Sequence, residues 1–306
     1  MQFSVSQWVQ STWKEHRPKP KSLIVTLFGD AIAPRGGTIR LGDLVNVARN
    51  FGLNERLVRT CVFRLAREGW ITAKRQGRRS SYSLTPNGML SFQRAYKRVY
   101  SEPHRQWDGS WTLVCLPYGT HSRSVRMKLE RELAWEGFGK VAPNVFGHPS
   151  PTLVTLRELL DLLDLSNRVF VLSARSLDVF ATLPLRKLVE QSWDLDGLAN
   201  GYRDFVQRFV LFENSLGPAK LTPSESFIIR TLLIHRFRRV TLHDPQIPAE
   251  LLPDEWPGHV AYELCHRIYQ KIYRDAENFL SQLVNASGGN LPELSPWFYQ
   301  RFGGLA

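Results

Sequence analysis

The amino-acid sequence predicts an α+β protein of three domains, at residues 19–100, 107–180 and 183–306. Three observations support this prediction. Short helical patterns and a β-hairpin fill the first stretch, strands alternate with helices in the second, and helical periodicity alone runs through the third. Proline-rich connectors separate the helices of the third stretch, and a polar linker separates the first two stretches near residues 101–107.

The first domain opens with apolar residues at helical spacing, which Gly36 and Gly37 interrupt. Asn54 can cap a later helix, and Pro86 directly after Thr85 is typical of a helix start. In chain order we expect a helix over 22–32, a strand over 38–41, helices over 43–51 and 53–68, hairpin strands over 70–75 and 80–84, and a helix over 85–100. This order is that of a winged helix-turn-helix.

The second domain alternates strand and helix patterns, which indicates a small ferredoxin-like domain. In chain order we expect a strand over 110–116, a helix over 123–137, a strand over 141–146, a helix over 153–165 and a strand over 168–173. The third domain is expected to be mainly helical, with helices over 185–192, 202–216, 224–242 and 260–283 and an irregular aromatic tail over 290–306.

Positive charge is concentrated in the first third of the chain. Residues 1–106 hold 19 Lys and Arg against 6 Asp and Glu, a net charge of +13, whereas the remaining residues hold 21 against 22, a net charge of −1. This asymmetry indicates a nucleic-acid-binding domain joined to a neutral body. A solvated basic surface and attraction to anionic lipid are the alternatives.

The cysteines and the apolar runs define the expected compartment. Cys61, Cys115 and Cys265 are too few and too scattered for a disulfide framework or a zinc site, which favours a reducing environment. No N-terminal signal sequence is visible, and the longest apolar run, near residues 23–28, is too short to span a bilayer. We therefore expect a cytoplasmic protein without a membrane partner.

The stretch 53–68 divides into two faces when it is placed on a helix at 100° per residue. The apolar face, expected to point into the core, holds Leu57, Val58, Cys61, Val62 and Leu65. The opposite face holds Arg56, Arg59, Thr60, Arg64 and Arg67, with Phe63 among them. A guanidinium fork can pair with guanine O6 and N7 or with phosphate, so this face is predicted to bind DNA rather than to be merely solvated. Phe63 is expected to pack against a neighbouring helix rather than on a base.

The hairpin supplies a second basic surface. Consecutive arginines at a hairpin tip repel one another, so a polyanion is their natural partner, through phosphate or minor-groove contacts. The full set of predicted DNA-binding residues is Asn54, Arg56, Arg59, Thr60, Arg64, Arg67, Lys74, Arg75, Arg78 and Arg79. Tyr82 fits either a core position or a hydrogen bond to phosphate.

Short motifs along nearly the whole chain carry a family resemblance. In the first domain they include Gly29-Asp30, Arg35-Gly36-Gly37, Phe63-Arg64-Leu65, Glu68-Gly69-Trp70 and Gly77-Arg78-Arg79-Ser80. Further along they include Trp107-Asp108-Gly109, Glu136-Gly137-Phe138-Gly139, Asp244-Pro245, Ile268-Tyr269-Gln270 and Tyr299-Gln300-Arg301-Phe302-Gly303. Together these motifs resemble the PaaX family, repressors of bacterial phenylacetate-degradation operons.

The resemblance implies a DNA-binding transcriptional repressor of an aromatic catabolic operon. It further implies a homodimer that binds double-stranded operator DNA and leaves it when an aryl-acyl-CoA effector, phenylacetyl-CoA in this family, is bound. It implies no cofactor.

A cluster of basic residues in the neutral part of the chain is the candidate effector site. Arginines near aromatic side chains suit a ligand with phosphates at one end and an aromatic ring at the other. The expected effector-binding residues are Trp135, His235, Arg238, Arg239 and His259. The alternative is a helix terminus whose charges pair with acidic neighbours such as Asp244.

We expect no catalytic residues and no metal site. The chain lacks a Gly-x-Ser-x-Gly elbow, a phosphate loop and a Rossmann glycine run. The alternative, a metal-dependent ferredoxin-like nuclease, would need an acidic residue at the end of its first strand, where this chain has Cys115-Leu116-Pro117. His259, Glu263 and His266 share one helix face without a further ligand. A third hypothesis, an architectural DNA-binding protein, does not require a neutral body of this size.

Overall fold

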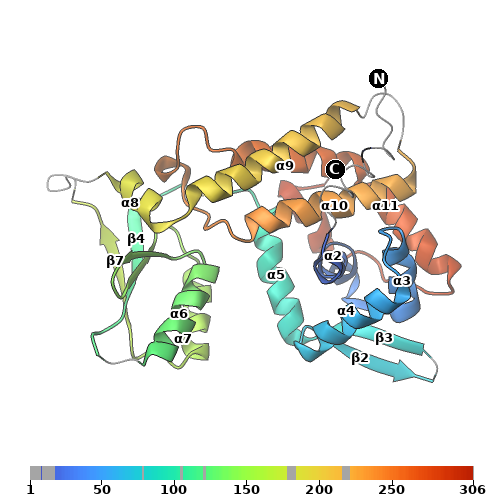
Figure 1. The fold of residues 1–306 in the computed structure, drawn as a ribbon, viewed down its shortest axis with the longest axis horizontal. Helices are drawn as coiled ribbons and strands as arrows, with labels where there is room; N and C mark the ends of the chain where they lie inside the picture. Colours follow the sequence, from blue (N-terminus) through green and yellow to red (C-terminus); the bar gives the residue numbers. More distant parts are fainter. Residues whose placement is uncertain are drawn as a thin grey trace. The chain divides into compact units, whose positions relative to one another are not determined.

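The computed structural model describes residues 8, 18–77, 79–103, 106–119, 122–177, 184–215 and 221–305. These residues form an α+β structure with two small antiparallel sheets, as predicted (Figure 1). Among them, no helix combines the length and the apolar character needed to cross a membrane.

The chain divides into two compact units. The first unit comprises Met1–Glu102, Asp204–Leu242 and Val260–Ala306, and the second comprises Pro103–Arg203 and His243–His259. The C-terminal stretch 183–306 therefore contributes residues to both units. The division into three domains stays a prediction.

The N-terminal part of the first unit has the expected order of elements (Figure 1). In chain order they are α2 (Pro20–Leu27), the π-helical turn η1 (Phe28–Ile32), η2 (Ala33–Arg35), β1 (Thr38–Arg40), α3 (Leu41–Arg49), α4 (Glu55–Arg67), β2 (Ile71–Gln76), β3 (Arg79–Leu84) and α5 (Pro86–Tyr100). The strands form an antiparallel sheet in the order β1-β3-β2. Gly36 and Gly37 have φ values of +83° and +72°. Glycine adopts such values without steric cost because it has no Cβ, and the two residues therefore allow the chain to turn from η2 into β1.

The first unit has one hydrophobic core, which N-terminal and C-terminal segments share. Apolar residues of α2, α3 and α4, among them Leu23 and Val58, pack in the same buried cluster as Phe227 and Leu280. The two C-terminal residues belong to α10 (Pro223–Thr241) and α11 (Gly258–Ala286). The Thr222 hydroxyl and the Glu225 side chain form a capping box at the start of α10. The C-terminal helices therefore complete a core to which the N-terminal segment contributes most of the buried side chains.

The second unit contains a four-stranded antiparallel sheet in the order β5-β6-β4-β7. Its elements are β4 (Ser110–Cys115), α6 (Arg123–Trp135), β5 (Gly139–Ala142), β6 (Val145–His148), α7 (Leu153–Leu162), β7 (Phe170–Arg175), α8 (Leu185–Ser192) and η3 (Ala249–Leu251). The succession β4-α6-β5-β6-α7-β7 is the β-α-β-β-α-β order of ferredoxin-like units. The single strand predicted over 141–146 is wrong, because the chain reverses at Asn144, whose φ is +61°, and forms the two strands β5 and β6.

The remaining elements lie outside these groups. Helix α9 (Leu195–Ser215) begins in the second unit and ends in the first. The tail, predicted to be irregular, contains the 3₁₀ segment η4 (Pro296–Gly303), and it places Phe298 and Arg301 in the interior of the first unit.

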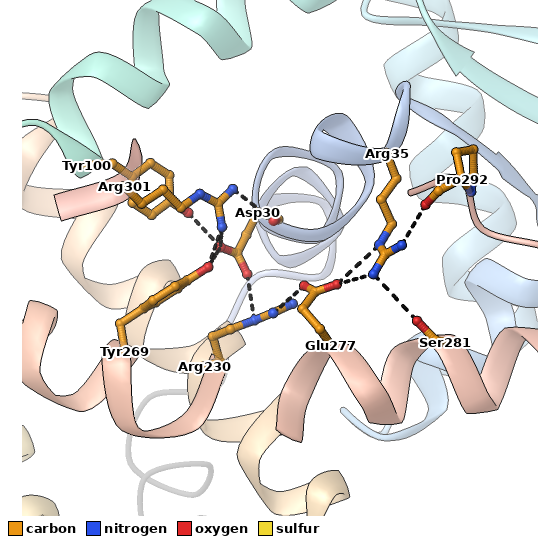
Figure 2. A network of polar contacts seen from close by, with 9 residues as sticks. All are labelled: Asp30, Arg35, Tyr100, Arg230, Tyr269, Glu277, Ser281, Pro292 and Arg301. Atoms are coloured by element: carbon orange, nitrogen blue, oxygen red, sulfur yellow. Dashed lines mark hydrogen bonds and ion pairs between the residues drawn. The ribbon is translucent and has the colours of Figure 1, made fainter. Parts of the chain in front are cut away.

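A buried polar network connects η1, α5, α10, α11 and η4 of the first unit (Figure 2). The Asp30 carboxylate, on η1, accepts hydrogen bonds from the Tyr100 hydroxyl at 2.6 Å and from Arg301 Nη1 at 2.9 Å. Its other oxygen lies 3.1 Å from Arg230 Nε on α10. The Tyr269 hydroxyl on α11 donates to Asp30 at 3.2 Å. Burial is the largest influence on both tyrosines and raises the pKa of each, so they act as neutral donors.

Glu277 on α11 holds the other half of this network. Its carboxylate accepts hydrogen bonds from Arg230 and, at 2.7 Å, from Arg35 Nη2. Arg35 also donates to the Pro292 carbonyl at 2.6 Å. Although burial opposes a charged side chain, the two carboxylates raise the pKa of Arg230 above its usual value. The network therefore consists of three buried guanidinium groups and two buried carboxylates.

We predict that Asp30→Asn lowers the free energy of unfolding by about 3–5 kcal/mol, because removing one partner of a buried ion pair leaves the other charge uncompensated. Urea denaturation followed by circular dichroism measures this change. The matched control is Glu68→Gln, which removes a carboxylate paired with Lys21 at the surface and should cost less than about 1 kcal/mol. Equal losses in the two variants would contradict the assignment of Asp30 to a buried network.

Candidate DNA interface

Helix α4 is fixed on the first unit by its cap and its apolar face. The Asn54 side chain accepts a hydrogen bond from the Leu57 backbone N–H at 2.9 Å, as expected of an N-cap. Four of the five predicted core residues are buried: Val58, Cys61, Val62 and Leu65. Leu57 is the exception, because it is 36% exposed and lies at the margin of the apolar face. The opposite face is therefore presented to solvent.

Five of the residues predicted to bind DNA lie on this exposed face of α4. Its members are Arg56, Arg59, Thr60, Arg64 and Arg67, and we call these five residues the arginine face. Arg59 donates through Nε and Nη2 to Glu55 Oε1, at 2.8 and 2.6 Å. The Thr60 hydroxyl donates to the Arg56 carbonyl at 2.9 Å. Phe63 is 62% exposed, so the expectation that it packs against a neighbouring helix is wrong.

The β2–β3 hairpin lies beside α4 in the first unit (Figure 1). Strand β2 ends at Gln76 and strand β3 begins at Arg79. The Lys74 and Arg75 side chains on β2 are exposed. Arg75 Nε donates to the Gly77 carbonyl at 3.2 Å. Arg78 lies outside the described residues, and only the backbone of Arg79 is described. Tyr82 packs against the hydrophobic core, which favours the first of its two interpretations.

The five candidate effector residues fall in both units. Trp135, which is exposed, and His259 belong to the second unit. His235, Arg238 and Arg239 lie on α10 in the first unit. The structure does not determine how these two sets lie relative to each other, so the effector site stays a prediction.

Two of the α10 residues already have partners on α2. His235 Nδ1 lies 2.9 Å from the Thr26 hydroxyl, and Arg238 Nη1 donates to that hydroxyl at 2.9 Å and to the Ser22 carbonyl at 3.2 Å. Burial, followed by the charge of Arg238, lowers the pKa of His235 to about 3, so its imidazole is neutral at ordinary pH. The third residue, Arg239, is exposed.

The structure also shows the region where the nuclease alternative would need its metal ligands. Strand β4 ends at Cys115, one residue before the predicted end, and Leu116 and Pro117 follow it. Within the described residues, no three His, Cys, Asp or Glu side chains come together in an arrangement suited to a metal ion.

Sequence reasoning missed the network around Asp30 and Glu277. The sequence did contain one indication of this network. Asp30, Arg35 and Arg301 all belong to the family motifs, and none of them was predicted to bind DNA or effector. Two pairings join residues that are more than 200 positions apart along the chain: Arg35 with Glu277, and Arg301 with Asp30.

An exposed arginine face beside a basic hairpin defines the first unit as a candidate nucleic-acid-binding structure. Family models match three parts of the chain: "PaaX-like protein" over residues 19–88, "PaaX protein central Cas2-like domain" over 104–183 and "PaaX-like protein C-terminal domain" over 193–282. The chain belongs to the PaaX family.

Two individual proteins resemble this chain. It is 40% identical over 286 residues to the transcriptional repressor PaaX of Escherichia coli (strain K12), covering 93% of this chain and 90% of that protein. Its fold is similar to that of the uncharacterized protein Rv0674 from Mycobacterium tuberculosis, with a TM-score of 0.50 and 22% identity, over 78% of this chain and 90% of that one.

Proposed function

We propose that this chain is a transcriptional repressor that binds double-stranded operator DNA through a winged helix-turn-helix at residues 19–100. The observation that carries the proposal is the arginine face of α4 beside the basic hairpin, on the part of the chain with a net charge of +13. A relative of 40% identity that is a transcriptional repressor supports it, and favours it over the nuclease alternative. The protein acts in the cytoplasm, where bacterial chromosomal DNA lies.

In this proposal α4 is the recognition helix and enters the major groove. Glu55 holds one side of the Arg59 guanidinium, which leaves the donors at its far end free to pair with guanine O6 and N7. Arg64, Lys74 and Arg75 contact phosphates, which fix the register of the protein on DNA without reading sequence. A homodimer presents two such helices to an operator of two-fold symmetry.

The effector in this proposal is an aryl-acyl-CoA thioester, with phenylacetyl-CoA as the first candidate and the phenylacetate operon as the target. Arg239 is exposed and can meet a phosphate of the cofactor portion. Arg238 bonds to Ser22 and Thr26 on α2, so a ligand that engages Arg238 would change how α10 holds the DNA-binding segment. A tenfold loss of operator affinity requires about 1.4 kcal/mol of coupling, and bound DNA must weaken thioester binding equally.

We predict that Arg59→Ala lowers affinity for the operator by about 1–3 kcal/mol and relaxes preference at one position of each half-site, because a bidentate contact to guanine is lost. Selection from a random duplex library defines the operator, and fluorescence anisotropy measures binding to it. The comparison variant is Lys74→Ala on the hairpin, which should weaken operator and random DNA by similar factors and reduce the salt dependence. Equal losses on both DNAs for Arg59→Ala would show that base recognition lies elsewhere.

We predict that phenylacetyl-CoA weakens operator binding at least tenfold, whereas free phenylacetate has little effect, because only the thioester supplies phosphates and enough surface. Calorimetry measures thioester binding by the intact protein and by two variants. Arg239→Ala should bind the thioester less tightly and keep its operator affinity, and the control Arg274→Ala, an exposed arginine on α11, should match the unchanged protein.

Two results would contradict parts of this account. Unchanged thioester binding in Arg239→Ala removes this arginine from the effector site and leaves the repressor intact. Operator binding that no aryl-acyl-CoA affects removes the effector itself.

A further inference from the structure

One apolar side chain lies in the middle of the arginine face. On a helix, positions 56, 60, 63 and 67 form a single row, because they are spaced by four, three and four residues. This row reads Arg56, Thr60, Phe63 and Arg67, and all four side chains are exposed. Phe63 therefore stands at the centre of the surface that the proposed function directs toward DNA.

Phe63 contributes little to the packing of its own helix. The four core residues of α4 are each at most 5% exposed, whereas Phe63 is 62% exposed. An aromatic ring left in water forfeits the stabilisation that its burial would give. A partner that covers the ring recovers this stabilisation on binding.

Thr60 presents a second apolar group beside the ring. Its hydroxyl donates to the Arg56 carbonyl at 2.9 Å, so its methyl group is the part of the side chain that remains for an external contact. Thr60 and Phe63 are three residues apart and are neighbours on the helix surface. The row thus has an apolar centre with an arginine at each end.

We propose that Phe63, together with the Thr60 methyl group, contacts the C5-methyl group of a thymine in the major groove and so selects thymine at one position of each half-site. This inference rests on the proposed function. The thymine methyl is the apolar group that bases present in this groove, and phenylalanine and threonine side chains are suited to contact it.

Other partners fit this surface less well. A phosphate needs hydrogen-bond donors, which the Phe63 ring does not have. A second copy of the chain, packed symmetrically on this face, would bring its arginines against those of the first, and like charges in an interface are unfavourable. Duplex DNA satisfies the arginines and covers the ring at once.

Replacement of single thymines by deoxyuridine tests the inference, because it removes only the C5-methyl group. An operator is first selected with the intact protein, and each thymine is then replaced in turn. We expect one position at which the replacement weakens binding about fourfold in one half-site and about sixteenfold in both, the effect of one buried carbon group. Phe63→Ala should lose most of the discrimination between the thymine and uracil operators, and the Thr60 methyl group accounts for what remains.

Two further variants make the test specific. Phe63→Leu keeps an apolar group and should retain part of the discrimination. Leu211→Ala removes a similarly exposed side chain from α9 and should discriminate as the unchanged protein does. Because Phe63 is exposed, Phe63→Ala should also unfold at the same temperature as the unchanged protein and sediment as the same oligomer.

The inference is overturned if no thymine position responds to uracil in the unchanged protein, or if Phe63→Ala retains the response. It is also overturned if Phe63→Ala weakens the thymine and uracil operators by the same factor or changes the oligomeric state, since the ring would then serve the fold or a protein interface. Failure of the intact protein to select any preferred duplex would instead contradict the proposed function.

Discussion

The buried pairing of two carboxylates with three arginines determines how the segments of the first unit come together. Asp30 comes from η1, Arg230 from α10, Glu277 from α11 and Arg301 from η4. A buried charge without its partner is far more costly than a surface ion pair is favourable. Each charge of the network therefore has its partner only when these four segments and η2, which carries Arg35, are in place. The Arg301 guanidinium, 4.2 Å from the centre of the Tyr100 ring and 4.3 Å from that of Phe298, fixes the tail as well.

This arrangement bears on the proposed response to an effector. The helices that hold the segment proposed to bind DNA are C-terminal helices, because Phe227 and Leu280 share its core and Arg238 bonds to α2. A ligand that alters α10 or α11 acts on that segment through packed side chains and hydrogen bonds, and no hinge between α2 and these helices is required. Such coupling is in keeping with small shifts of packed helices as a means of switching.

Local sequence signals predicted the secondary structure and the exposed face of α4 well, and long-range pairings poorly. The Asn54 cap, the Pro86 helix start and the alternation of apolar and basic residues on α4 all depend on neighbours within one or two turns. The prediction that Phe63 packs against a neighbouring helix was wrong. Periodicity shows on which face of a helix a residue lies, but it cannot show whether another helix covers that face. The pairing of Asp30 with Arg230 and Arg301 could not be predicted, because single charged residues carry no signal of a distant partner.

The central claim is that the elements proposed to bind DNA fold only together with α10, α11 and the tail. A fragment of residues 1–102 tests it most directly, because it retains every helix and strand of the predicted winged helix-turn-helix. It removes both arginine partners of Asp30 and the Glu277 partner of Arg35. Urea denaturation followed by circular dichroism, with the intact chain as the reference, should show no cooperative unfolding transition for the fragment. A fragment that unfolds cooperatively and binds the selected operator would contradict the claim.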